Sequence, residues 1–255
     1  MDIIEQFILL AISLLANLLS AMAGGGAGLL QLPALIFLGL PFSIALATHK
    51  IATVALGVGA TTKHIQEKNA HWPFALLMLV CGLPGVIFGA NIILAVPETT
   101  AKLLLGLLTI GIGVYSLLHK KLGQEHSPKN RHTVGLVFGG IGLFALGIFN
   151  GSLTSGTGLF VTLWLITWFG FDYKRATAYT MILVGLFWNA TGALTLALQA
   201  PVQWEWLPML LIGSVLGGYF GAHIAVKYGN PLIKVIFQIV AIFVGLSLIY
   251  SSIAA

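Results

Sequence analysis

The feature that most constrains this chain is a succession of apolar runs separated by short polar breaks. Several runs reach the roughly 20 residues that a helix needs to cross a bilayer. Inside a bilayer the backbone must satisfy its own hydrogen bonds, so apolar runs of this length form helices. Only 7% of the residues are charged and 58% are hydrophobic, whereas a soluble domain carries about 25% charged residues. The sequence therefore predicts an all-α, polytopic membrane protein.

We expect helical segments, full or partial, at residues 3–22, 27–39, 43–61, 72–95, 100–118, 133–149, 158–170, 176–198, 205–226 and 231–252. Two of them, 27–39 and 158–170, are too short to cross a core of about 30 Å at a rise of about 1.5 Å per residue. Each follows a glycine-rich stretch. We interpret these two as half-helices that begin at unwound backbone.

The two halves of the chain resemble each other in order and spacing. At a nearly constant offset, Gly26, Gly28 and Leu29 match Gly156, Gly158 and Leu159, Gly39, Ala45 and Ala47 match Gly170, Ala176 and Ala178, and Trp72, Phe88, Lys102 and Gly113 match Trp204, Phe220, Lys234 and Gly245. An odd number of segments in each half, five, turns the second half upside down relative to the first. We predict a single transmembrane domain, residues 1–255, built of two inverted repeats (about 1–119 and 133–255) and joined by a cytoplasmic linker, 120–132.

The basic residues give the orientation, because cytoplasmic loops carry an excess of lysine and arginine. With the N-terminus outside, the cytoplasmic segments hold Lys63, Lys68, Lys120, Lys121, Lys129, Arg131, Lys174, Arg175, Lys227 and Lys234. Lys102 alone lies outside, and Lys50 lies within a span. Both termini are therefore expected on the extracytoplasmic side.

The two glycine-rich breaks indicate a binding site at membrane depth. Unwound backbone is tolerated there only where protein buries it or where it lines a wet cavity. In an inverted repeat the two half-helices approach the midplane from opposite sides, and their N-termini favour an anion between them. The alternative is that these glycines only allow close helix packing, which is our interpretation of Gly82, Gly85, Gly89, Gly213, Gly217 and Gly221.

Lys50 is the only charged residue deep within a predicted span. Intramembrane cations normally face a cavity or a polar partner, so we expect Lys50 to supply a fixed positive charge to the site. Its neighbour His49 can carry protons near neutral pH. Lys50 could instead extend its side chain to the membrane surface, and His49 could be a hydrogen-bonded core residue.

The candidate substrate-binding residues are those of the two breaks together with this pair: Gly26, Ala27, Gly28, His49, Lys50, Asn150, Ser152, Ser155, Gly156, Thr157 and Gly158. Hydroxyl, amide and backbone N–H groups are suitable donors to an oxyanion. The alternative for each serine or threonine is a hydrogen bond to a carbonyl of its own helix.

No enzyme, metal or cofactor motif accompanies these residues. The sequence lacks His-Glu-x-x-His, Gly-x-Ser-x-Gly and a P-loop, and Cys81 is its only cysteine. We expect no catalytic residues, no cofactor and no nucleic-acid partner. The sequence leaves open the coupling ion, proton or sodium, and whether the protein forms a homodimer in the lipid bilayer.

Three motifs in order resemble the sulfite exporter TauE/SafE family. They are Gly24 to Leu35 with its glycine run, Ala47-Thr48-His49-Lys50, and Ser155-Gly156-Thr157-Gly158. The resemblance implies a bacterial or archaeal plasma-membrane protein that transports sulfur-containing anions such as sulfite or sulfonates. The chain departs from it at Asn150, where many members carry an aspartate, at His49, where asparagine is commoner, and at Thr154-Ser155, which replaces Gly-Pro.

We therefore expect a secondary transporter that moves a small sulfur-containing anion through a midplane site. Two alternatives remain open at this point. One is a passive anion channel built on the same site, and the other is a membrane assembly factor or lipid-handling enzyme.

Overall fold

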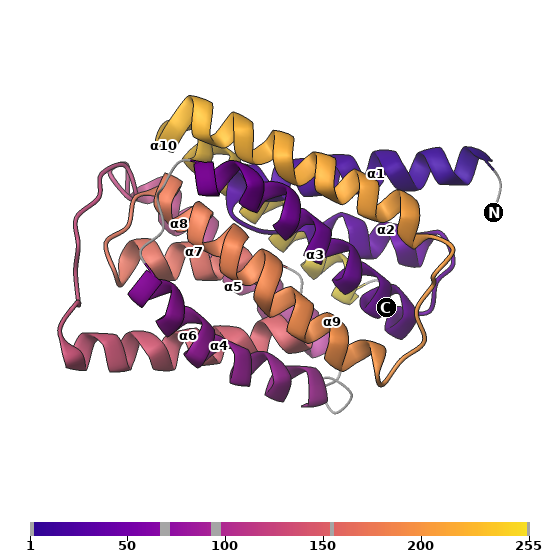
Figure 1. The fold of residues 1–255 in the computed structure, drawn as a ribbon, viewed down its shortest axis with the longest axis horizontal. Helices are drawn as coiled ribbons and strands as arrows, with labels where there is room; N and C mark the ends of the chain where they lie inside the picture. The colour runs from indigo at the N-terminus through magenta and orange to yellow at the C-terminus, as the bar shows by residue number, and fades with distance from the viewer. Residues whose placement is uncertain (1–2, 67–71, 93–97, 154–155, 254–255) are drawn as a thin grey trace.

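The computed structural model describes residues 3–66, 72–92, 98–153 and 156–253, and in these ranges the chain forms helices and turns without a strand. The longer helices run roughly along one axis of the molecule (Figure 1). Six of the described helices are long and apolar enough to cross a membrane. The prediction of a polytopic all-α membrane protein is confirmed.

The first half contains α1 (Ile3–Ala23), a 3-10 turn η1 (Ala27–Leu29), α2 (Gln31–Phe37), α3 (Phe42–Gln66), α4 (Trp72–Ile92) and α5 (Glu98–Leu118). The first half-helix is thus shorter than predicted, because it divides into the 3-10 turn and a seven-residue helix. By contrast, α3 extends past the predicted end at residue 61. The prediction followed the apolar run, whereas the last turn of the helix carries the polar residues Lys63 and His64.

The second half contains α6 (Thr133–Leu153), α7 (Thr157–Thr167), α8 (Tyr173–Tyr179), a π-helical segment η3 (Thr180–Trp188), α9 (Asn189–Ala197) and α10 (Leu207–Ile253). The segments α8, η3 and α9 form one continuous span, which the sequence predicts as an ordinary helix. α10 is two helices joined at a kink, where Gly229 has a φ of 71°. The kink falls between the predicted spans 205–226 and 231–252.

Paired glycines of the two halves adopt the same left-handed conformation. Gly26 and Gly156 precede the two half-helices with φ of 107° and 76°, and Gly39 and Gly170 follow them with φ of 102° and 70°. Non-glycine residues seldom adopt these angles. The inverted repeat stays an interpretation, which these matched conformations support.

The first helix of each half packs on the fourth helix of the other half. α1 lies along the first part of α10, where a Cβ at Gly217 would come 2.5 Å from the Leu14 oxygen. α6 lies along α4 in the same way, since a Cβ at Gly85 or Gly89 would collide with the backbone of α6. The packing role predicted for these glycines is therefore supported by the structure. Each half depends on the other for one of its helix contacts.

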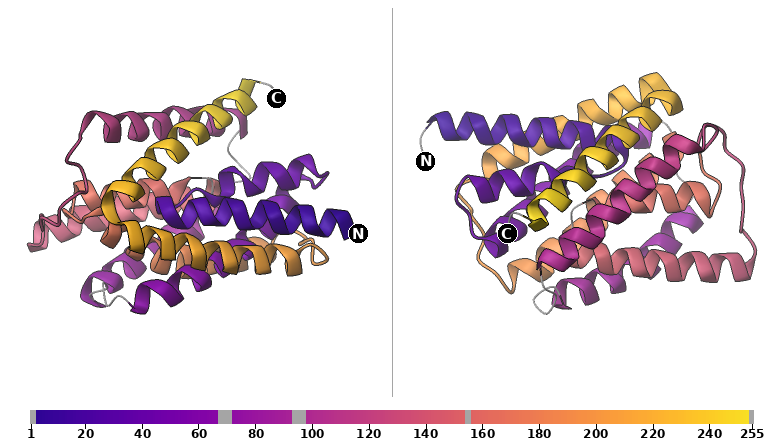
Figure 2. Two further views of the ribbon diagram at one scale, coloured as in Figure 1. Left: turned by 90° about the horizontal axis from the view of Figure 1, so that it is seen from above. Right: turned by 180° about the vertical axis from the view of Figure 1, so that it is seen from behind.

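The third spans of the two halves meet in the middle of the molecule. α3 contacts the π-helical segment so closely that a Cβ at Gly57 would collide with the backbone of Gly185. The start of α1 and the end of α10 lie toward one end of the long axis, and the linker between α5 and α6 lies at the other (Figures 1 and 2). This placement is the one that the predicted topology requires.

Candidate functional site

The two glycine breaks touch each other in the interior, backbone against backbone. Gly24, Gly25 and Gly26 have φ of 84°, 147° and 107°, so the chain leaves α1 in a conformation suited to glycine. A Cβ on Gly25 would lie 2.5 Å from the Cα of Gly158, at the start of α7. The Thr162 hydroxyl of α7 donates to the Gly24 oxygen at 3.0 Å and so ties the two breaks together.

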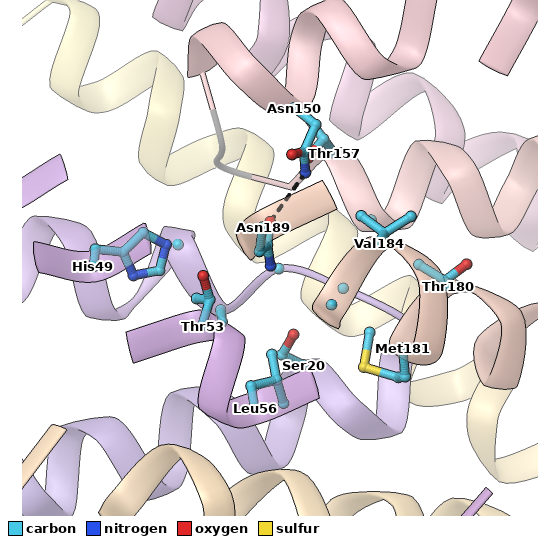
Figure 3. A pocket seen from close by; sticks show the side chains of 16 residues that line it. Ser20, His49, Thr53, Leu56, Asn150, Thr157, Thr180, Met181, Val184 and Asn189 are labelled. Atoms are coloured by element: carbon cyan, nitrogen blue, oxygen red, sulfur yellow. Dashed lines mark hydrogen bonds between the residues drawn. The ribbon is translucent and has the colours of Figure 1, made fainter. Parts of the chain in front are cut away.

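Beside this contact is a narrow cavity of about 30 Å³, measured as the volume open to the centre of a water molecule. It is lined by Ser20, Gly25, Gly26, Ala27, Gly28, His49, Thr53, Leu56, Asn150, Thr157, Gly158, Thr180, Met181, Val184, Gly185 and Asn189. Figure 3 shows these side chains converging from both halves of the chain. On the same measure one buried water needs about 10–15 Å³, so in this conformation the cavity suits a small polar guest and excludes a bulky one.

Lys50 is fully buried beside the cavity but does not line it. Its Nζ donates to the Asn150 main-chain oxygen at 2.8 Å, to Asn150 Oδ1 at 2.9 Å and to Asn189 Oδ1 at 3.2 Å. Three acceptors match the three N–H donors of an ammonium group. In this conformation the ammonium group contacts two asparagines, and the role of Lys50 in substrate binding stays a prediction.

These bonds fix the orientation of both amides. Asn150 and Asn189 turn their oxygens to Lys50, so their Nδ2 groups face elsewhere. Asn150 Nδ2 donates to Thr157 Oγ1 at 3.0 Å and approaches Asn189 Oδ1 at 3.4 Å. Asn189 Nδ2 is turned toward the first glycine break (Figure 3). An amide N–H of this kind can donate to an anion in the cavity.

His49 faces the cavity from α3 and is held from behind. Its Nδ1 lies 2.8 Å from Gln31 Oε1, Gln31 Nε2 donates to Ser13 Oγ at 3.0 Å, and Ser13 Oγ donates to the Leu210 oxygen at 2.6 Å. Nε2 is therefore the ring nitrogen on the cavity side (Figure 3). His49 joins the cavity to a polar chain that reaches α10.

Ser20, near the end of α1, has a buried hydroxyl for which the described residues offer no hydrogen-bond partner. The residue is 2% exposed and lines the cavity. An unsatisfied buried hydroxyl costs free energy. A guest with an acceptor atom would remove that cost.

The remaining predicted residues divide into three groups. Gly26, Ala27, Gly28, Thr157 and Gly158 line the cavity. Gly156 is the N-cap of α7 and does not line the cavity. Ser152 does not line it either, and its hydroxyl donates to its own helix at the Ile148 oxygen, 2.9 Å away. Ser155 lies outside the described residues.

Several cavity residues were not among the sequence candidates. Thr180, Met181, Val184 and Gly185 come from the π-helical segment, and Asn189 follows directly after it. A π-helix is wider than an α-helix and often occurs at functional sites. Asn189 and Thr180 are polar residues within an apolar span, and this is the signal of the wall that the sequence carries.

Comparison with known proteins identifies the family of this chain. The family described as sulfite exporter TauE/SafE matches residues 9–248, nearly the whole chain. The chain belongs to the TauE/SafE family. It is accordingly a multi-pass membrane protein of a transporter family.

Its TauE/SafE relatives include bacterial proteins named as probable membrane transporters. YfcA of Escherichia coli K12 is 31% identical over 96% of this chain and 90% of its own length. A protein of Haemophilus influenzae is 28% identical over 95% and 94%, and YunE of Bacillus subtilis is 24% identical over 96% and 98%. No solved structure matches this chain. The names of these relatives state transport but no substrate.

Proposed function

We propose that this protein is a secondary transporter of a small sulfur-containing oxyanion, bound in the cavity between the two glycine breaks. The observation that carries the proposal is the convergence of both breaks on one buried polar cavity, with the Lys50 charge fixed behind two asparagine amides. Such midplane sites at the interface of two repeats are typical of secondary transporters.

The chemistry of the cavity favours an anion. Lys50 contributes a positive charge, and no acidic residue is among the described residues that line the cavity. Asn189 Nδ2 and the Ser20 hydroxyl are donors on its wall. The first backbone N–H groups of the eleven-residue helix α7 begin at Thr157, so their partial positive charge adds to the field. Together these groups replace part of the hydration that an oxyanion loses.

The small volume supports a carrier rather than an open pore. A channel needs a continuous wet path, whereas the cavity admits little more than water in this conformation. Transport then requires the wall to move, so that the cavity opens to each side in turn. Sulfite and short sulfonates are small members of the class of anions that the family resemblance implies.

Flux measurements with purified protein in liposomes test the proposal. We expect uptake of sulfite or a short sulfonate that saturates with concentration and is accelerated by the same anion on the opposite side. Flux that does not saturate and shows no acceleration would identify a channel instead. Absence of flux for sulfite, thiosulfate, sulfate and methanesulfonate would refute the proposed function.

A further inference from the structure

We propose that His49 binds the proton that moves with the anion, so that the transporter couples each anion to one proton through His49 Nε2. This inference rests on the proposed function and names its coupling ion. Of the described residues that line the cavity, His49 is the one with an imidazole, the side chain that most often carries protons in proteins. The hydrogen bonds on the far side of the ring show that His49 Nε2 is free to accept a proton from the cavity.

The bonds behind His49 fix its tautomer. The Leu210 carbonyl can only accept, so Ser13 donates to it and must accept from Gln31. The Gln31 amide therefore turns its nitrogen to Ser13 and its oxygen to the ring, and Nδ1 of His49 is the donor. In the neutral ring Nε2 then carries a lone pair, which points into the cavity.

Protonation of Nε2 changes the cavity and nothing behind it. The incoming proton adds to the Nε2 lone pair from the water on whichever side the cavity is open, and no bond of the cargo breaks. Nδ1 keeps its proton and its bond to Gln31. Nε2 thus changes from a hydrogen-bond acceptor to a charged donor, which favours binding of an oxyanion.

The surroundings make the protonated ring depend on the anion. Lys50 is the one charged group among the described residues near enough to act on His49, and it is repulsive. The polar groups on the neighbouring elements are neutral: Ser13, Asn17 and Ser20 on α1, Gln31 on α2, Asn150 on α6, Asn189 on α9 and Ser214 on α10. A buried cation without a counter-charge is costly. An anion in the cavity supplies that counter-charge, so proton and anion favour each other's binding by the same factor.

Lys50 itself is a poorer candidate for the proton carrier. Each of its N–H donors has an oxygen acceptor, and the ammonium group does not line the cavity. Its proton would have to pass through the asparagine amides to reach the cargo. His49 presents its nitrogen to the cavity directly.

Proton movement during methanesulfonate uptake tests the proposal. Methanesulfonate carries no proton of its own near neutral pH, so any proton that accompanies it comes through the protein. Liposomes with the full-length protein enclose a pH-sensitive dye, and the membrane potential is clamped. For the wild type we expect an inward methanesulfonate gradient to acidify the lumen by one proton per anion.

His49→Asn retains a short amide that can donate to Gln31 but has no titrating nitrogen. We expect it to lose lumen acidification while still exchanging methanesulfonate at saturating concentration, which also shows that it folds. Thr53→Val is the matched control, because Thr53 lines the same cavity and donates to its own helix at the Lys50 oxygen. Whatever its rate, Thr53→Val should keep the wild-type ratio of protons to anions.

A binding measurement on the wild type covers the case in which His49→Asn does not fold. If one proton binds with each anion, the Kd for methanesulfonate should rise about tenfold per pH unit where free His49 is neutral. Methanesulfonate uptake without protons in the wild type, an unchanged proton ratio in a folded His49→Asn, or a pH-independent Kd would each overturn the inference. None of these results would affect the proposed function, which fails if the wild type transports no anion or if its flux is that of a channel.

Discussion

A buried ammonium group must satisfy three N–H donors, and Lys50 does so with neutral oxygens of two asparagines. The consequence is that its charge reaches the cavity through the amides that it orients. Gly192 makes this arrangement possible, since a Cβ there would lie 3.3 Å from Lys50 Cε and crowd the lysine stem. Lys50 is in this sense a positioning residue for Asn189.

A double-mutant cycle distinguishes this role from direct contact with the cargo. Lys50→Met should weaken anion binding about tenfold, or about 1.4 kcal/mol, and Asn189→Ala by a similar factor. Because Lys50 acts through Asn189, the double variant should bind little worse than either single variant. Independent contributions would multiply to about a hundredfold.

The control for that cycle is Lys234→Met, measured for anion binding in the same way. Lys234 makes the same kind of contact far from the cavity, donating to the oxygens of His119 and Lys120 at 2.6 and 2.7 Å. Its substitution should leave the affinity unchanged. A tenfold loss here would mean that removing any buried lysine perturbs the protein generally.

Ser20→Ala should separate stability from binding. The substitution removes a buried hydroxyl without a partner among the described residues, which relieves a cost of about 1–3 kcal/mol if no water satisfies it. The empty protein should therefore melt at the same or a higher temperature, while the added stability from a saturating anion should shrink. A variant that melts lower and keeps the full anion effect would contradict a role for Ser20 in binding.

At the level of residues, the sequence indicates which side chains form the site but not the hydrogen bonds that connect them. Lys50 and His49 stand out because ionisable side chains are rare in apolar spans. Gln31, Ser13 and Ser20 do not stand out, because their roles depend on partners brought close by folding, as when Ser13 meets Leu210. The orientation of Asn189 also depends on a π-helix that apolar periodicity does not predict.

The elements themselves follow closely from the sequence, since run length and glycine placement decide where helices begin and end. The breaks illustrate the reason: Gly26 and Gly156 take left-handed angles before the half-helices, and Gly39 and Gly170 take them after. The sequence does not predict that the two glycine breaks contact each other. The contact between Gly25 and Gly158 arises only when the two halves assemble.

This contact predicts a sharp effect of adding one methyl group. Gly158→Ala would place its Cβ 2.8 Å from the Gly24 oxygen and 2.8 Å from the Gly25 Cα. The breaks must then separate, so we expect loss of anion flux and a lower melting temperature. Gly111→Ala is the control, because a Cβ at Gly111 on α5 meets nothing within 4 Å. It should retain flux and gain up to about 1 kcal/mol of helix stability.

On the scale of the whole molecule, the positions of the termini and linker predict the membrane topology. The start of α1 and the end of α10 lie toward one end, and the linker lies at the other (Figures 1 and 2). In a protein whose native Cys81 is replaced, a cysteine at position 2 should react with an impermeant reagent outside intact cells, and one at position 125 only after lysis. The reverse labelling pattern would invert the orientation, and labelling of both from outside would contradict the inverted repeat.

Because the first helix of each half packs on a helix of the other half, we predict that neither half is stable alone. α1 packs on the first part of α10 and α6 packs on α4, so either half expressed by itself exposes small-residue faces that the other half covers. Co-expression of residues 1–125 and 126–255 should restore both proteins and anion flux, since the cut falls in the linker and leaves every helix whole. Membrane levels of each half, alone and together, measure this directly. A control pair cut within α3 divides the helix that carries His49 and Lys50 and should not complement. If the first half accumulated in the membrane by itself to the level of the intact protein, the crossed contacts would contribute little to stability, and the two halves would be independent units that merely share a chain.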